Sequence, residues 1–209
     1  MSQSECVDFD EQSLVERLRS GDQQALAELF GRERSRLERI VRFRLDPRLF
    51  GRVDVEDVLQ DTYVEALQRL PHYLRGSPVS FFVWLRSMTR QTLIDIHRRH
   101  LGAQGRDAAR EVAIESWRFP VATSVSLASV LAGDLTSPSQ AAMRDERAAR
   151  LHQALEQMDD MDREVLALRH FEDLSNQEVA EALGISQKAA SMRYVRALER
   201  LKQAMKEEG

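Results

Sequence analysis

The chain has 209 residues, which is enough for one medium domain or two small ones. Charged residues make up 31% and aromatic residues only 6%, and nine Gly and five Pro leave few hairpin turns, so the composition favours helices over β-sandwiches. The single cysteine, Cys6, excludes a disulfide framework and a cysteine-ligated zinc site. No apolar stretch resembles a secretory signal or a membrane span. We therefore expect a cytoplasmic, all-α protein without membrane contact.

The net charge of −4 argues against a general nucleic-acid binder, but the charge is unevenly distributed. Residues 71–118 are basic overall, and the segment from Gly184 to Lys206 contains Glu199 as its only acidic residue. Acidic stretches precede both segments. This pattern fits ordinary solvated helix faces, and it also fits two nucleic-acid contacts with two acidic surfaces for a basic protein partner. Charge alone does not decide between these interpretations.

The first half of the chain contains signals for three helices. Asp22 is placed to cap a helix over residues 23–45, which the pair Asp46-Pro47 would end. Asp54 is placed to cap a second helix, whose apolar residues recur at intervals of three and four until Pro71. Ser77 followed by Pro78 predicts the start of a third helix that runs to about His100.

Periodicity then fades between residues 101 and 137, a stretch with several Gly and a Ser/Thr/Ala-rich middle. Such a length without a clear pattern predicts a linker between two domains, with one or two short helices in it. At full extension it would span roughly 120 Å. Ser137-Pro138 repeats the helix-start signal and opens the second half.

The second half ends in a helix-turn-helix pattern. Ser175 and Glu178 form a predicted capping box, Gly184 supplies the turn, and Ser186 caps the last helix. The last helix would bury Ala190, Tyr194, Ala197, Leu198 and Leu201 and direct basic and small side chains outward. A plain helical hairpin would also explain the glycine turn. The cap, the turn and the basic second helix together favour DNA binding through the major groove.

Two further blocks make the chain resemble the sigma-70 family of RNA polymerase initiation factors, in its small extracytoplasmic-function (ECF) type. DVEDVLQDTYVEALQRL at residues 54–70 is similar to the polymerase-binding helix of that family, and FFVWLRSMTRQTLIDIHRR at residues 81–99 is similar to its −10 helix. MDREVLALRHFEDLSNQEVAEALGIS resembles region 4. The resemblance implies two helical domains, region 2 over residues 12–100 and region 4 over residues 138–207, joined by the long linker 101–137.

The resemblance also assigns roles to particular side chains. Polymerase binding would fall to the acidic helix, through Asp54, Glu56, Asp57, Gln60, Asp61 and Glu65. Capture of the −10 element would involve Tyr73, Arg75, Ser77, Trp84, Arg90, Gln91, Arg98 and Arg99. Reading of the −35 element would fall to Lys188, Ser191, Met192, Arg193, Val195, Arg196 and Lys202.

The residue types themselves agree with these roles in part. The helix dipole explains the carboxylates of the first turn, but Asp61 and Glu65 lie beyond it and suit a basic partner. Phe81 and Trp84 are better explained as core contacts than as exposed rings. Arg86 and His97, on other faces of the same helix, would suit phosphates together with the arginines listed above.

The implied partners are core RNA polymerase, through the clamp of its largest subunit and the flap of its second-largest subunit, and promoter DNA. An anti-sigma factor is a further candidate partner. A stand-alone helix-turn-helix repressor is the second hypothesis and would bind a palindrome as a dimer. An enzyme is the third, but the five histidines show no metal-binding spacing and no phosphate-binding loop is present. We therefore expect no catalytic residue, no metal and no cofactor.

Overall fold

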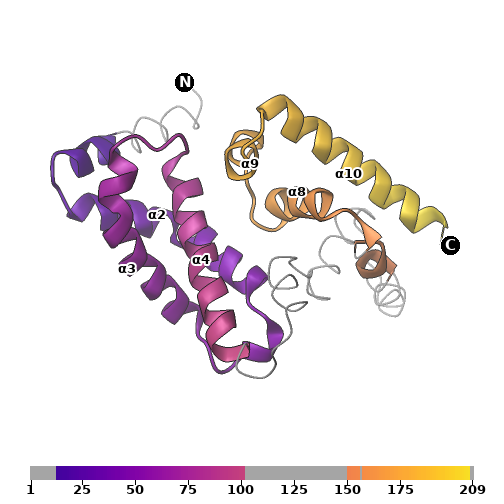
Figure 1. The fold of residues 1–209 in the computed structure, drawn as a ribbon, viewed down its shortest axis with the longest axis horizontal. Coiled ribbons are helices and arrows are strands. Elements are labelled where there is room, and N and C mark those ends of the chain that lie inside the picture. Colours follow the sequence, from indigo (N-terminus) through magenta and orange to yellow (C-terminus); the bar gives the residue numbers. More distant parts are fainter. Residues whose placement is uncertain (1–12, 102–149, 156, 208–209) are drawn as a thin grey trace, which may run out of the picture.

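The computed structural model describes residues 13–101, 150–155 and 157–207, and every regular element in these ranges is a helix (Figure 1). After a helical segment at residues 13–19 come α2 (Gln24–Arg44), the short 3-10 helix η1 (Pro47–Leu49), α3 (Val55–Leu74) and α4 (Phe81–Leu101). Residues 150–155 are helical, followed by α8 (Asp160–His170), α9 (Asn176–Leu183) and α10 (Gln187–Glu207). The all-α expectation is confirmed for the described residues. None of the described helices is long and apolar enough to cross a membrane.

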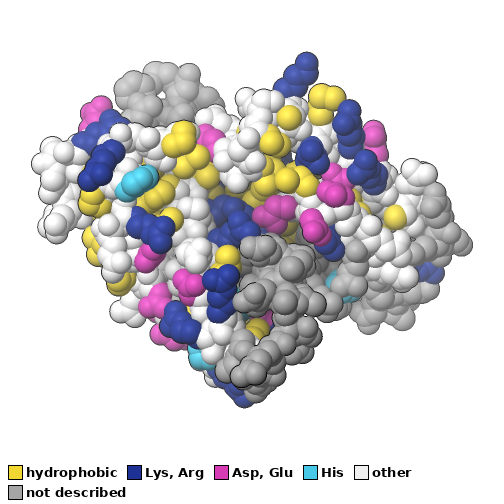
Figure 2. All heavy atoms as spheres, viewed as in Figure 1, with side chains coloured by type: hydrophobic (Ala, Val, Ile, Leu, Met, Phe, Trp, Pro, Cys, Tyr) yellow, Lys and Arg dark blue, Asp and Glu magenta, His cyan; other side chains and the backbone are white. Residues whose placement is uncertain are grey.

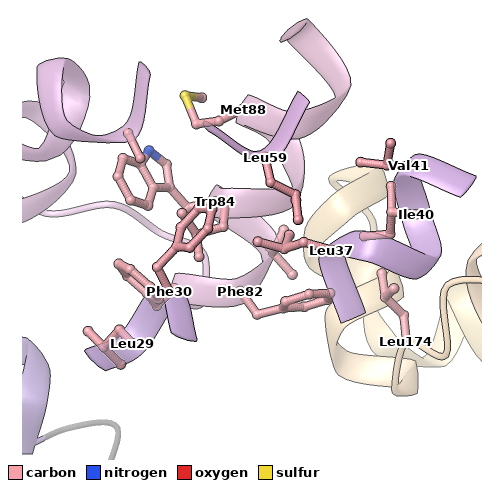
Figure 3. Packing of buried hydrophobic residues seen from close by; sticks show 14 of the residues in the cluster. Leu29, Phe30, Leu37, Ile40, Val41, Leu59, Phe82, Trp84, Met88 and Leu174 are labelled. Atoms are coloured by element: carbon pink, nitrogen blue, oxygen red, sulfur yellow. The ribbon is translucent and has the colours of Figure 1, made fainter. Parts of the chain in front are cut away.

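The first half is a bundle of α2, α3 and α4. Each helix buries the stripe that its periodicity predicts, so that Leu37, Leu59 and Phe81 are almost fully inaccessible to solvent. Phe30 of α2 meets Tyr63 of α3 edge to face, with ring centroids 5.1 Å apart. Figure 3 shows Phe30, Leu37, Leu59 and Trp84 converging from the three helices. The bundle thus holds the exposed faces of α3 and α4 in a fixed relation.

Local signals predicted the helix termini of the second half correctly. Ser175 Oγ accepts the backbone N–H of Glu178, whose carboxylate in turn accepts the N–H of Ser175. Gly184 adopts the left-handed conformation with φ 63°, and the N–H of Ile185 then bonds to Ala180 O at 3.0 Å. Ser186 Oγ accepts from Ala189 N at 3.2 Å and caps α10. α9 and α10 therefore form the predicted helix-turn-helix.

Two predicted helix boundaries are wrong. α3 does not end at Pro71 but continues to Leu74 with the proline inside it. Proline removes one backbone donor, and here that loss falls in the last turn, against the carbonyl of the exposed Leu67. α4 begins at Phe81 instead of Pro78: Ser77 Oγ accepts from Val79 N within a bend, and the first helical hydrogen bond runs from Trp84 N to Ser80 O at 3.0 Å.

The two halves are in contact and share apolar core. One continuous cluster of buried residues contains Ile40 and Phe82 of the first half together with Leu168, Leu174 and Val179 of the second. Figure 3 shows Leu174 beside Ile40 and Val41 of α2. The predicted linker, from residue 102 onward, and the helix start at Ser137-Pro138 lie outside the described residues.

Candidate functional site

The acidic face of α3 is exposed but partly neutralised by arginines of the same chain. Asp54 caps the helix, and Asp57, Gln60 and Asp61 are exposed beside it. Three other contacts were not expected from the sequence: Arg34 pairs with Glu56, Arg69 pairs with Glu65, and Arg99 lies 3.9 Å from Asp61. These carboxylates remain accessible, since exposed ion pairs exchange readily with water and with competing charges.

Apolar side chains lie on the same helix as these carboxylates. Val64 is 47% exposed and Leu67 40% exposed on α3. Because residues three and four apart share a helix face, Gln60, Val64 and Leu67 form one row beside the acidic one. Mixed charged and apolar surfaces of this kind are typical of protein contacts. From the sequence alone, Val64 and Leu67 cannot be distinguished from the buried apolar residues of the same helix.

The loop before α4 rests on an aromatic base. Tyr73 is half-buried and stacks on Trp84, with ring centroids 4.6 Å apart and an interplanar angle of 29°. Trp84 is only 8% exposed, in agreement with the core interpretation, so its ring supports Tyr73 from beneath the surface and does not line it. Arg75 is exposed and Ser77 half-buried. Tyr73 is therefore the ring of this pair nearer to solvent.

The outer face of α4 carries Arg90, Arg98 and Arg99, all exposed. Gln91 is half-buried and its Nε2 donates to both carboxylate oxygens of Asp95 at 3.3 Å. This contact leaves the carbonyl oxygen of the Gln91 amide as an acceptor for another group. The outer face thus combines three cations with one oriented amide.

Arg86 and His97 are corrections, because both are buried and not available to phosphates. Each is 6% exposed. His97 Nε2 accepts the backbone N–H of Asp46 at 3.2 Å, at the end of α2. Burial lowers the pKa of His97, with Arg48 acting in the same direction and Asp46 against it. His97 is therefore a neutral structural acceptor.

The first turns of α10 present the predicted outward face. Met192 is 46% and Val195 51% exposed, Lys188 and Arg196 are exposed, and Ser191 is half-buried. Figure 2 shows basic side chains over this part of the molecule. Arg193 lies 3.8 Å from Asp162, and Arg200 binds the same carboxylate, while Lys202 is exposed further along. The outward face therefore combines cations with two apolar side chains.

Sequence reasoning missed a buried ionic cluster between the halves. It joins Arg44 of α2 and Arg86 of α4 to Glu164 of α8 and Glu172 of the following loop. A signal for this cluster was present in the sequence. Arg44 follows Ile40 by four residues and Arg86 follows Phe82 by four, which puts both arginines on buried stripes.

Within the described residues, no group of His, Cys, Asp and Glu is arranged to hold a metal ion.

Comparison with known proteins agrees with this geometry. Residues 29–102 match the model of Sigma-70 region 2 and residues 154–203 that of Sigma-70, region 4. The chain is 30% identical over 197 residues to RNA polymerase sigma-H factor of Pseudomonas aeruginosa, covering 93% of both. It is 31% identical over 184 residues to ECF RNA polymerase sigma factor SigD of Mycobacterium tuberculosis, covering 88% of this chain and 78% of SigD.

A solved structure shows the same fold. CnrH in complex with the cytosolic domain of CnrY is similar with a TM-score of 0.52 and 24% identity, covering 95% of this chain and 99% of CnrH. The helical bundle, the helix-turn-helix and these matches lead to one conclusion. The chain belongs to the sigma-70 family of RNA polymerase sigma factors, in its ECF type.

Proposed function

We propose that this sigma factor divides its work among three surfaces. As a sigma factor it directs promoter-specific transcription initiation with core RNA polymerase and has no enzymatic activity, which excludes the repressor and enzyme hypotheses. The α3 face binds the clamp of the largest polymerase subunit, the loop 72–77 with the outer face of α4 takes the −10 element, and α10 reads the −35 element. The second half also contacts the flap of the second-largest subunit.

One observation carries the proposal most directly. The first turns of α10 expose Lys188, Met192, Val195 and Arg196 on a helix that a capping box and a left-handed glycine hold at a fixed angle. Recognition helices contact base edges with their N-terminal residues, where arginine suits guanine and apolar groups suit the thymine methyl. α10 thus has both the geometry and the side chains of a major-groove reader.

The −10 role rests on the loop and on α4. A base drawn from the duplex must regain the few kcal/mol that unstacking costs, through stacking and hydrogen bonds. Tyr73, backed by Trp84, supplies a ring near the surface, and Gln91 supplies an amide oxygen. Arg90, Arg98 and Arg99 lie on the same helix for the phosphates.

The proposed partners set where the factor works. Because core polymerase and promoter DNA are found there, we propose that it acts in the bacterial cytoplasm. An anti-sigma factor remains a proposed partner as well, since the structurally similar CnrH was solved with the cytosolic domain of CnrY.

The test is transcription in vitro with core polymerase and a panel of promoter variants. Arg196→Ala should change the preferred −35 sequence, because a base-contacting arginine contributes about 1–3 kcal/mol of discrimination. Lys202→Ala should weaken all promoters evenly, as a phosphate contact does. Arg32→Ala, an exposed arginine of α2, is the control and should change neither. An Arg196→Ala profile identical to that of the wild type would refute the base-reading role.

A further inference from the structure

A buried carboxylate lies between α8 and α10, two helices of the second half that pack against each other (Figure 1). Asp162 of α8 is only 3% exposed. Its Oδ2 accepts a hydrogen bond from Arg200 Nη1, and its Oδ1 lies 3.8 Å from Arg193 Nη1. Because a buried carboxylate requires counter-charges, Asp162 and these two arginines form one unit, which we call the Asp162 cluster.

The start of α8 does not depend on Asp162. Asp159 caps the helix by accepting the backbone N–H of Met161 at 2.9 Å, and Asp160 adds an exposed carboxylate to the first turn, where it pairs with Arg163. These two groups already satisfy the preference of a helix N-terminus for negative charge. The burial of Asp162 is therefore explained by its contacts with α10 and not by capping of α8.

The two arginines of the cluster form a row along one flank of α10. Seven residues separate them, which is two helix turns or roughly 10 Å along the axis. Ala197 lies between them in this row and is fully buried, while Arg196, three residues after Arg193, is exposed on the outward face. The row thus borders both the buried stripe and the face that the proposed function assigns to the bases.

Both guanidinium groups keep access to solvent. The side chain of Arg193 is 43% exposed and that of Arg200 is 64% exposed. A guanidinium carries several N–H donors, so the contact with Asp162 leaves donors for a second acceptor. One carboxylate and two arginines together retain a net positive charge. The cluster is therefore able to bind an anion outside the protein while Asp162 stays buried beneath it.

The flank of a helix that lies in a DNA groove has a particular use. Its central face meets the base edges, and its flanks meet the phosphates that border the groove. An arginine loses rotamer freedom when it binds a phosphate, and one that is already held in place has less freedom to lose. A carboxylate that holds two flanking arginines therefore lowers the entropic cost of backbone contacts.

We propose that Asp162 is a positioning residue that holds Arg193 and Arg200 for the phosphates beside the major groove. The inference rests on the proposed function, because it requires α10 to read the −35 element. Asp162 itself does not touch the DNA. The two arginines supply affinity without sequence information, and base reading remains with Lys188 and Arg196 on the outward face.

The test measures how tightly the full-length factor, assembled with core polymerase, binds a duplex promoter fragment at a series of salt concentrations. Asp162→Asn keeps the shape of the side chain, but its amide NH₂ cannot accept from an arginine. Because the logarithm of the affinity falls with the logarithm of the salt concentration in proportion to the number of phosphate contacts, the slope should decrease by about 1. Affinity should fall by about threefold to tenfold for every −35 sequence tested, without a change in sequence preference.

Asp160→Asn is the matched control for this change. It removes a neighbouring carboxylate of the same helix turn and an arginine contact that does not involve α10. It should keep the wild-type slope. A wild-type slope for Asp162→Asn overturns the positioning role. Tighter binding by Asp162→Asn than by Asp160→Asn also overturns it, because Asp162 would then withhold the arginines from the DNA.

A purely structural role of Asp162 would give a different result. Partial unfolding lowers the amount of active factor but does not change the slope of the molecules that bind. A triple variant, Asp162→Asn with Arg193→Met and Arg200→Met, removes both cations together with their counter-ion and leaves no unpaired charge in the cluster. It should lower the slope by about 2. A wild-type slope for the triple variant would show that neither arginine contacts a phosphate, and would overturn the proposal.

The outcomes separate this inference from the proposed function. If Arg196→Ala and Lys202→Ala behave as predicted while Asp162→Asn keeps the wild-type slope, α10 reads the −35 element without help from Asp162. If Arg196→Ala and Lys202→Ala both behave like the wild type, the −35 role of α10 is wrong and the positioning role falls with it.

Discussion

His97 illustrates how a side chain on a basic segment can serve the fold and not the DNA. It lies among Arg90, Arg98 and Arg99 in the sequence, yet its ring is turned inward to the end of α2. An unprotonated Nε2 must accept the Asp46 N–H, and protonation would remove that acceptor. The pKa of His97 is lowered mainly by burial, so the fold favours the neutral ring.

This predicts a dependence of stability on pH. Because the unfolded chain titrates near pH 6.5 and the folded ring below it, the unfolded state binds more protons in that window. The contribution of His97 is thus fully present above pH 6.5 and is lost as the pH falls below it. The melting temperature of the wild type should fall between pH 7.5 and 5.5 by more than that of His97→Gln. His170, whose pKa burial and Arg169 also lower, is common to both proteins and cancels in the comparison.

Parallel pH curves for His97→Gln and the wild type would contradict the assignment of His97 as a neutral structural acceptor.

His97 also marks a limit of sequence reasoning. Residue type assigned Arg86 and His97 to phosphates, and the family resemblance assigned Trp84 to the −10 element. All three are buried, and burial depends on partners far along the chain, such as Glu172 for Arg86. Single-residue chemistry does not show which face of a helix another domain will cover.

At the scale of elements, the termini predicted from sequence were correct where the signal is local. Asp54, Ser175 with Glu178, Gly184 and Ser186 all act within four residues of their own position. Pro71 and Ser77-Pro78 failed because their effect depends on how far a helix end is supported by packing. The acidic helix was predicted as an element, while its pairing with Arg34, Arg69 and Arg99 was not.

The α3 surface gives a prediction about polymerase binding. Asp61→Lys with Glu65→Lys should weaken binding to core polymerase, because the reversed charges repel a basic partner and also release Arg69 and Arg99 from their contacts. The fold should be retained, since exposed charges rarely change stability by more than about 0.5 kcal/mol. Fluorescence titration of labelled factor with core polymerase measures the effect.

The control for this change is Glu16→Lys with Glu28→Lys. It reverses the same number of carboxylates and also breaks an arginine contact, that of Glu28 with Arg17, outside the α3 face. The control should bind polymerase like the wild type. Equal loss of binding in both double variants would mean that net charge, and not the α3 face, sets the affinity.

At the scale of the molecule, two domains were predicted from the fading periodicity between them, and the described halves do fold as a bundle and a helix-turn-helix. Their contact was not predicted, because it is made by residues that each half uses as part of its own pattern. Leu174 and Val179 fit the stripe of their own domain and yet pack into the cluster that contains Ile40. A contact between domains of this kind has no separate signature in one sequence.

The continuous core predicts how the whole molecule unfolds. Because apolar packing and the Glu172 cluster join the halves, separating them exposes surface that both lose together, so unfolding should be one cooperative transition. Calorimetry of the wild type should give equal calorimetric and van't Hoff enthalpies. Glu172→Gln should uncouple the halves and give two transitions, whereas Asp173→Asn, which alters an exposed contact only, should keep one. Two transitions in the wild type would show that the halves are already independent, and the buried cluster would then contribute nothing to their coupling.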